Sequence, residues 1–308
     1  MPKIIDMSPT VNEDRGEWPA LKLSDWADTR DTLHMWTQMV GKVRLALAPP
    51  VNHWWHVALY TTTAGLTTSP MPANGGTLEL SLDFREHVLI FAASDGSRRT
   101  IPLRPQTVAD FYASFTKVLR EMHVDVHIWP MPVEVASPIR FDRDREHKSY
   151  DAAAVERWFQ VVRQVDIVLK DFRGRFIGKC SPVHFFWGSF DHAVTRFNGK
   201  RAPAREGADA ITREGYSHEV ISAGFWPGSG SVPDAAFYSY AAPEPPGFRD
   251  ASITPDGASY NAEFSNFILM YDVVRRSPSP RAAALEFLQS TYDAAANLAR
   301  WNRADLER

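Results

Sequence analysis

The stretch FIGKCSPVHFFWGSFDHAVTRFNGKRAP, from Phe176 to Pro203, decides how we expect this chain to fold. It combines many aromatic and β-branched residues with the only cysteine, Cys180. From Val183 to Phe197 the composition is typical of a strand and too rich in such residues for a helix. We therefore predict one central strand over 183–197 and look for a functional site on it.

Side chains alternate between the two faces of a strand, so this prediction assigns each residue of the stretch to one of two faces. One face would hold His184, Phe186, Gly188, Phe190, His192 and Val194. The other face would hold Phe185, Trp187, Ser189, Asp191 and Thr195. A hydroxyl and a carboxylate would thus lie beside an indole, opposite a largely apolar face.

Two helices with the same apolar spacing begin the two halves of the chain. The first shows steps of 3, 4, 3 and 4 between its apolar residues, Leu33, Trp36, Val40, Val43 and Leu47. The second repeats these steps at an offset of 122, with Val155, Trp158, Val162, Val165 and Leu169. Each set forms one apolar helix face. WTQMVGKVRLAL from Trp36 and WFQVVRQVDIVL from Trp158 share five of twelve residues.

Strands and a closing helix follow in the same order in both halves. The first half predicts strands over 52–63, 77–84, 87–93, 98–103 and 124–129, and a helix capped by Thr107. The second predicts, after the central strand, strands over 216–225, 236–241 and 264–274 and a helix from Ser279-Pro280. His53 aligns with His184 in this comparison. The shared order favours an internal duplication over chance similarity of two amphipathic helices.

The sequence predicts an α+β fold made of two tandem pseudo-repeats, each a helix, an antiparallel meander and a helix, packed as one compact body. We expect a flexible tail over 1–19, a first repeat over 20–133, a linker over 134–150 and a second repeat over 151–308. The second repeat is longer, with Gly- and Pro-rich loops over 198–214, 227–234 and 243–257. Long loops on a scaffold are where function is often placed.

Composition excludes several classes of partner. The net charge of −3 and the isoelectric point near 6.4 give no basic field for nucleic acid or an anionic membrane. No apolar run approaches the roughly 18 residues of a spanning helix. The start lacks the apolar core of a signal peptide, and one cysteine suits a reducing compartment, so we expect a cytoplasmic monomer or homodimer.

Three motifs carry a resemblance to a known family: GKCSPVHFFWGSFDHAVTRF from Gly178, YSHEVISAGFWPG from Tyr216 and LHMWTQMVGKVRLALAPPVNHWWH from Leu33. In them the chain resembles members of an uncharacterised bacterial family, a domain of unknown function. The resemblance covers nearly all of the chain beyond its tail. It implies a bacterial protein and brings no activity, cofactor or site residue with it.

Motifs for cofactors and metals are weak. GRFIGKCS lacks the glycine spacing of a phosphate loop, and no G-x-G-x-x-G opens a helix, so we expect no nucleotide cofactor. His53 and His56 would point to opposite faces of a strand and could not easily share an ion. The other metal candidates are His184, His192, His218 and Glu219. We expect no metal, and interpret His53 and His184 as buried neutral imidazoles.

One functional hypothesis is a hydrolase that uses His184, Asp191, His218 and Glu219. These ionisable groups sit among large apolar residues and are costly to bury alone, so we expect them in one neighbourhood. A bulge near Gly188 could bring His184 and Asp191 to one face. Otherwise we expect two sets, His184 with His218, and Asp191 with Glu219 or Arg196.

The favoured hypothesis is a protein that binds a small molecule against the second-repeat sheet. Aromatic residues on neighbouring predicted strands can line a concave pocket, although most of them are expected to form core. The candidate ligand-binding residues are Trp187, Phe186, Ser189, Phe225, Trp226, His53 and Trp55. A purely structural or protein-binding role is a third possibility.

Overall fold

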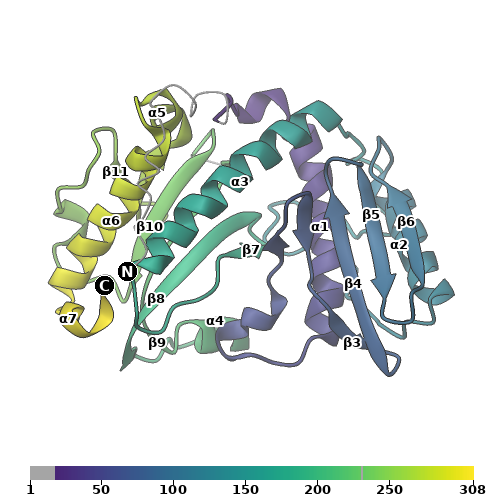
Figure 1. Cartoon of the computed structure of the whole chain (residues 1–308), viewed down its shortest axis with the longest axis horizontal. Coiled ribbons are helices and arrows are strands. Elements are labelled where there is room, and N and C mark those ends of the chain that lie inside the picture. The colour runs from purple at the N-terminus through teal and green to yellow at the C-terminus, as the bar shows by residue number, and fades with distance from the viewer. Residues whose placement is uncertain (1–17, 230–231) are drawn as a thin grey trace, which may run out of the picture.

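The computed structural model describes residues 18–229 and 232–308, and most of the predicted tail, residues 1–17, lies outside this part. Within it the chain forms two antiparallel sheets of six strands each, together with helices, which confirms the α+β class (Figure 1). One sheet comes from each half of the chain. The helix α1 (Ala27–Leu47) lies between the two sheets.

In the first half, three of the five predicted strands and the predicted second helix are confirmed. Its strands are β1 (Tyr60–Thr61), β2 (Gly65–Thr67), β3 (Met71–Ala73), β4 (Gly76–Asp83), β5 (Val88–Ala93) and β6 (Arg98–Pro102). They pair in the order β1-β2-β4-β5-β6, with β3 also on β4. The helix α2 (Val108–Glu121) begins where predicted, because the Thr107 side chain accepts a hydrogen bond from the Asp110 N–H at 3.1 Å.

Two strands predicted for the first half are wrong. Residues 52–57 form a 3-10 helix, η3 (Asn52–Val57), and only Tyr60–Thr61 of the predicted strand over 52–63 enters the sheet. The reason is visible in the backbone, since His53 and Trp54 adopt left-handed φ angles of 59° and 60° that no strand contains. Residues 124–129 have no regular structure.

The second half begins with the long helix α3 (Ala152–Gly174). Its strands are β7 (His184–Phe186), β8 (Asp191–Arg201), β9 (His218–Trp226), β10 (Ala236–Ala242), β11 (Ser259–Asn261) and β12 (Asn266–Met270). Their order is β11-β12-β10-β9-β8-β7. The strand predicted over 264–274 ends at Met270, where α5 (Tyr271–Arg276) begins. The remaining helices are η2 (Leu23–Asp25), α4 (Ala210–Gly215), η4 (Phe248–Asp250), α6 (Pro280–Leu298) and α7 (Arg303–Leu306).

The core lies where the helices meet the sheets. The helices α3 and α6 pack side by side on one face of the second sheet (Figure 1). The Trp158 ring of α3 lies 5.6 Å from the Phe84 ring of the first half and 5.1 Å from Phe190 of the second. Trp36 stacks on Phe111 of α2 at 4.5 Å, so it joins α1 to α2.

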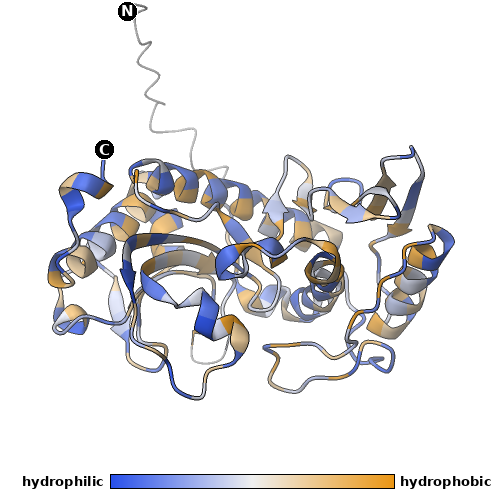
Figure 2. Ribbon diagram, turned by 90° about the horizontal axis from the view of Figure 1, so that it is seen from below, coloured by the Kyte–Doolittle hydropathy of each residue, from blue (hydrophilic) through white to orange (hydrophobic). Residues whose placement is uncertain are grey.

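Among the described elements, no long helix covers the other face of the second sheet. Seen from below, its strands arch above the short helix α4 (Figure 2). The ladder register places Thr195, Ser222, Tyr240 and Tyr238 on this face. The candidate site described below lies on the side of this polar face, next to α4.

Both halves run from a helix through an antiparallel sheet to a helix. The aligned segments around His53 and His184 differ, however, because the first is a 3-10 helix and the second a strand. Trp36 and Trp158 also have different ring partners. The internal duplication, the linker and the domain boundaries stay predictions.

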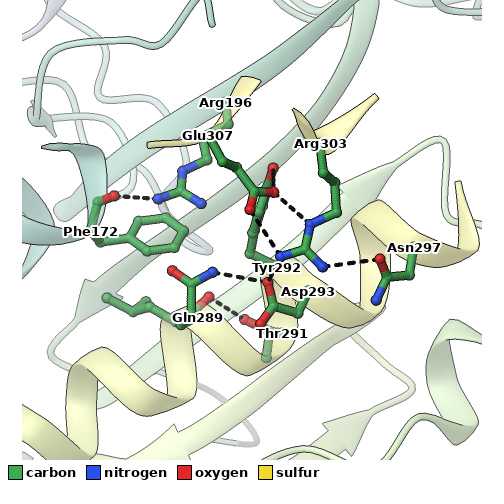
Figure 3. A network of polar contacts seen from close by, with 10 residues as sticks. Phe172, Arg196, Gln289, Thr291, Tyr292, Asp293, Asn297, Arg303 and Glu307 are labelled. Carbon is green, nitrogen blue, oxygen red and sulfur yellow. Dashed lines mark hydrogen bonds and ion pairs between the residues drawn. The ribbon is translucent and has the colours of Figure 1, made fainter. Parts of the chain in front are cut away.

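The C-terminal helix is fixed by a polar network (Figure 3). Arg303 donates to Glu307 and to Asp293, at 2.6 Å each, and Tyr292 donates to Glu307 at 2.8 Å. Beside them the fully buried Arg196 donates to the Phe172 carbonyl in the last turn of α3 and stacks over the Phe172 ring. This network joins α3, α6, α7 and β8, and we interpret it as structural.

Candidate functional site

The predicted central strand is in fact a hairpin. The chain leaves β7 at Phe186, turns through residues 187–190 and returns along β8 from Asp191. Phe190 takes a left-handed φ of 60°, a conformation that favours glycine or asparagine in turns. The prediction of one continuous strand over 183–197 is therefore wrong.

The helix α1 holds this turn in place. His34 Nε2 lies 2.8 Å from the Gly188 carbonyl and 3.0 Å from the Trp187 carbonyl, so it donates to this turn. The Trp187 indole N–H donates to the Val57 carbonyl, and its ring packs against Gly41. Trp187 is therefore a buried structural residue, and its predicted role in ligand binding has no support in this packing.

The hairpin changes which residues share a face. His184 pairs with Ala193 and Phe186 pairs with Asp191 across the ladder. In a single continuous strand, His184 and Asp191 would have pointed to opposite faces. Directly opposed residues point to the same side of a sheet, so here His184 and Asp191 share a face. The turn achieves this without the predicted bulge at Gly188.

Asp191 is buried and fully engaged. It is 8% exposed and accepts hydrogen bonds from the Ser189 and Tyr238 hydroxyls. Burial raises the pKa of Asp191, while the two hydroxyl donors oppose that shift. The pKa of Glu134 is raised as well, first by burial and then by the charge of Asp191, so the two carboxyls are neighbours. Arg196, once a candidate partner of Asp191, lies on the other sheet face.

His184 lies in an aromatic enclosure. Its ring is 1% exposed and lies within 6 Å of the rings of Phe186 (5.3 Å), Tyr60 (5.7 Å) and Trp55 (5.9 Å). Burial, followed by the charge of Arg44, lowers the pKa of His184 to about 3. His184 is therefore buried, as predicted, and its lowered pKa favours the neutral form, but its Nε2 has no hydrogen-bond partner in the described part of the chain.

His218 and Glu219 lie at the far end of the hairpin. His218 pairs with Arg201, whereas Asp191 pairs with Phe186 at the other end of β8. A rise of about 3.3 Å per residue along an 11-residue strand separates the two ends by roughly 30 Å. Glu219 accepts a hydrogen bond from Asn198. The structure therefore does not assemble the four predicted catalytic residues, and neither predicted pair forms.

The remaining predicted ligand contacts divide between core and surface. Phe225 is buried against Phe237 and Tyr271, so it forms core. Trp226 is partly buried beside Tyr238 on the open sheet face. His53 and Trp55 lie together at one end of the second sheet, where a cleft opens.

This cleft lies between η3, α4 and the ends of β8 and β9, and has a volume of about 550 Å³. It combines predicted residues with residues that sequence reasoning did not select. Its lining consists of Asn52, His53, Lys179, Arg201, Ala210, Arg213, Glu214, Ser217 and His218. We refer to it below as the basic cleft.

His53 is the most firmly held residue of the basic cleft. Its backbone N–H donates to Glu214 Oε1 at 3.1 Å, and its Nδ1 lies 3.0 Å from the Glu214 carbonyl oxygen. A carbonyl only accepts, so Nδ1 carries the proton and Nε2 is left with a free lone pair. The Lys179 ammonium donates to that Nε2 at 2.7 Å.

The backbone at His53 is strained. Consecutive left-handed residues without glycine cost on the order of 1–3 kcal/mol each, and His53 and Trp54 are such a pair. The two hydrogen bonds to Glu214 hold the first of them in place. Strain of this kind gathers at ligand-binding and active sites, which directs attention to the basic cleft.

Positive charge dominates the lining. Lys179, Arg201 and Arg213 supply three cations against the one carboxylate of Glu214, a net of +2 with neutral histidines. The pKa of His218 is lowered by burial and then by the positive charges of Arg201 and Lys179. Across residues 18–229 and 232–308, neither Arg201 nor Arg213 forms an ion pair with a carboxylate.

A serine nucleophile does not fit the arrangement at Ser217. Its hydroxyl donates to the Glu214 carbonyl at 2.8 Å, and His218 Nδ1 lies 3.0 Å from the same hydroxyl oxygen. The serine proton is thus directed at the carbonyl, and the histidine donates to the serine instead of activating it. The pair fixes the ring of His218 rather than preparing a nucleophile.

Cys180 is also not set up as a nucleophile. Burial raises the pKa of its thiol to about 11, which outweighs the charges of Arg196 and Arg173. In the described ranges, no group of three or more His, Cys, Asp or Glu residues could hold a metal ion. None of the helices in those ranges is long and apolar enough to cross a membrane.

The sequence analysis did not select Lys179, Arg201, Arg213 or Glu214, because no spacing among them marks a site. They come from three separate segments, since Arg213 and Glu214 are adjacent in α4, and only the fold brings these segments around His53. The one available signal was the richness of the loop over 198–214 in charged residues.

Comparisons with known proteins locate the chain in one family. No curated protein and no solved structure matches it. Residues 18–308 match a family of unknown function (DUF5996), in agreement with the resemblance of the sequence motifs, and the chain belongs to that family.

Proposed function

We propose that the chain binds a small organic anion in the basic cleft. The observation that carries this proposal is the set of cations Lys179, Arg201 and Arg213 around a single carboxylate. Guanidinium groups bind carboxylates and phosphates with two parallel hydrogen bonds, and Arg201 and Arg213 form no ion pair with any carboxylate of the described residues. A ligand carboxylate or phosphate would supply the missing partner.

The size and walls of the basic cleft favour a small ligand over a polymer. A volume of about 550 Å³ falls within the usual range of ligand pockets, about 300–1,000 Å³. The His53 ring lies 4.6 Å from Phe197 and 5.5 Å from Trp55, so an apolar surface adjoins the charged one. The His53 ring lines the basic cleft and can contact the carbon skeleton of the anion while the arginines bind its charge.

Like the hypothesis favoured from the sequence, this proposal is that the chain binds a small molecule. The ligand site, however, lies at one end of the second sheet rather than along its surface. His53, Trp55 and His218 remain in or beside the site, at the end of the second sheet. Asp191 and Ser189 lie toward the other end of the hairpin and are not part of the proposal. The single cysteine is consistent with work in a reducing compartment such as the cytoplasm.

The test is a panel of small anions measured by thermal shift and then by calorimetry. The panel should include mono-, di- and tricarboxylates, 2-oxo acids and phosphate esters. We expect at least one to bind, with affinity that falls as salt rises, because an open cleft is screened. A charge-assisted hydrogen bond contributes about 1.5–3 kcal/mol, so Arg213→Gln or Arg201→Gln should weaken binding about tenfold or more.

Arg205→Gln is the matched control, since Arg205 lies over the Tyr216 ring and does not line the basic cleft. It should bind the anion as the wild type does. Equal weakening in all three variants, or no binding by any member of the panel, would contradict the proposal.

A further inference from the structure

We propose that Lys179 forms a reversible imine with the carbonyl group of a small 2-oxo acid whose carboxylate is held by Arg201 and Arg213. This inference rests on the proposed binding of an anion in the basic cleft and assigns its substrate class. It adds a covalent step that anion binding alone does not require.

The contacts of Lys179 resemble those of an activated nucleophile. Its Nζ lies 2.7 Å from His53 Nε2, and His53 Nδ1 donates to the Glu214 carbonyl at 3.0 Å. A nucleophile, a base and a group that orients the base thus follow one another. Because the carbonyl fixes the tautomer, the lone pair of Nε2 is directed at the lysine and can accept its proton.

The surroundings of Lys179 suit an amine that must lose its proton. Its Nζ lies 5.4 Å from the Trp55 ring centre and 5.1 Å from that of Phe197. In the ranges that the structure describes, it forms no ion pair, whereas Lys170 pairs with Asp166 and Lys117 with Glu121. Burial lowers the pKa of Lys179.

The same rings suit the product. A protonated imine is a cation at the position that the ammonium group leaves, and aromatic faces attract such cations. Trp55 and Phe197 would therefore stabilise the iminium ion, and within the described residues no carboxylate forms an ion pair with this nitrogen. A simple binding lysine would need neither His53 nor this aromatic setting.

The step balances without a further reactant. His53 Nε2 takes one proton from the ammonium group, and the freed amine pair forms a bond to the carbonyl carbon. The π electrons of the carbonyl move to its oxygen, which takes the proton back from His53. His53 then takes a second proton from the nitrogen, which gives the neutral carbinolamine, and passes that proton to the hydroxyl. The nitrogen pair forms the C=N bond as the C–O bond breaks, one water leaves, and the protonated imine keeps one hydrogen and the single positive charge of the original ammonium group. Hydrolysis reverses every step.

The substrate class follows from the positions of the cations. A 2-oxo acid carries its carboxylate directly beside the reacting carbonyl, so one small molecule can engage the arginines and the lysine together. Holding both partners in one cleft makes imine formation effectively unimolecular. A neutral aldehyde or ketone would lack the contact to Arg201 and Arg213.

Borohydride trapping tests the inference on the full chain. The protein is mixed with pyruvate or glyoxylate, reduced, digested and mapped by mass spectrometry, with lactate as the anion that lacks a carbonyl. We expect the reduced adduct on Lys179 at a level at least tenfold above any other lysine. Lys42, whose pKa burial lowers to about 8, is the competing amine to monitor.

Two variants sharpen the result. Lys179→Arg keeps the charge and should abolish the adduct, whereas Lys200→Arg, at an exposed neighbouring lysine outside the cleft lining, should leave it unchanged. His53→Asn tolerates the left-handed backbone and removes the base, so the trapping rate should fall about 100-fold or more.

The outcomes separate this inference from anion binding. If 2-oxo acids and lactate bind by calorimetry but no adduct concentrates on Lys179, the imine is wrong and the proposed function stands. If neither binds and no adduct forms, the imine is wrong, and the proposed function is wrong as well only if no other anion of the panel binds. An adduct spread evenly over the lysines, and unchanged in Lys179→Arg, would also overturn the inference. Peptide mapping of the wild type decides this even if a variant does not fold.

Discussion

Leu59 and Phe185 exchange both of their backbone hydrogen bonds, at 2.9 Å each, and this pair connects the two sheets. It lies just after η3 and inside β7, so it brings the 3-10 helix of the first half against the second sheet. The basic cleft therefore takes Asn52 and His53 from the first half and its remaining lining residues from the second. Its integrity depends on the packing between the halves.

Trp158 should be a major contributor to that packing, because its ring contacts Phe84 of one half and Phe185 and Phe190 of the other. Trp158→Ala should lower the free energy of unfolding by about 3–5 kcal/mol in denaturant titrations. Ile167→Ala on the exposed face of the same helix should change it by about 0.5 kcal/mol or less. A loss under about 1 kcal/mol for Trp158→Ala would show that its contacts do not stabilise the fold.

Replacing Gly41 by alanine should change the stability in the direction opposite to the one that helix propensity alone predicts. Alanine in place of glycine inside a helix normally gains about 1 kcal/mol. Here a Cβ would lie 2.1 Å from Trp187 Cδ1, so the buried indole would have to move. Gly41→Ala should therefore destabilise the chain by about 1–3 kcal/mol.

Gly174 is the matched control for Gly41, since a Cβ there would meet no atom within 4 Å. Gly174→Ala should be neutral or stabilising by up to about 1 kcal/mol in the same denaturant titration. Similar effects of the two substitutions would mean that Trp187 does not pack on α1 as described.

The buried histidines predict how stability depends on pH. Burial lowers the pKa of His34 to about 4, and those of His184 and His192 to about 3. Between pH 6.5 and 4 the unfolded chain binds protons at these residues and the folded chain does not. Stability should therefore fall as the pH falls through this window, with each residue contributing up to about 1.4 kcal/mol per pH unit.

The raised pKa of Asp191 has the opposite effect on stability. As the pH rises above 3.8, the unfolded chain loses this proton before the folded chain does, so the contribution of Asp191 to stability falls. Unfolding titrations at several pH values separate the two effects. His34→Gln should reduce the slope of the unfolding free energy against pH, between pH 6.5 and 4, by the equivalent of about one bound proton. Asp191→Asn should not reduce this slope. An unchanged slope in His34→Gln would refute a neutral His34.

The helices and most of the meander strands could be predicted because their apolar residues recur at fixed spacing. The apolar spacing correctly predicted α1 and α3, and the Ser279-Pro280 pair correctly predicted the start of α6. It failed at His53 and Phe190, which adopt left-handed φ angles. No propensity argument assigns that conformation to a histidine or phenylalanine, since neighbouring contacts impose it.

The candidate site could be predicted only in part for a related reason. His53, Trp55 and His218 were selected as unusual residues in apolar segments. Lys179, Arg201 and Arg213 looked like ordinary surface charges, because their convergence depends on the Leu59–Phe185 pair and on the position of α4. Distances between segments far apart in the chain are not encoded in local spacing.

Binding of a small anion in the basic cleft is tested most directly by a crystal structure of the chain with the tightest anion found in the panel. We expect electron density for the ligand between η3 and α4, with its oxygens within hydrogen-bond distance of Arg201 and Arg213. Ligand density at any other place, with the basic cleft occupied by solvent alone, would contradict anion binding there.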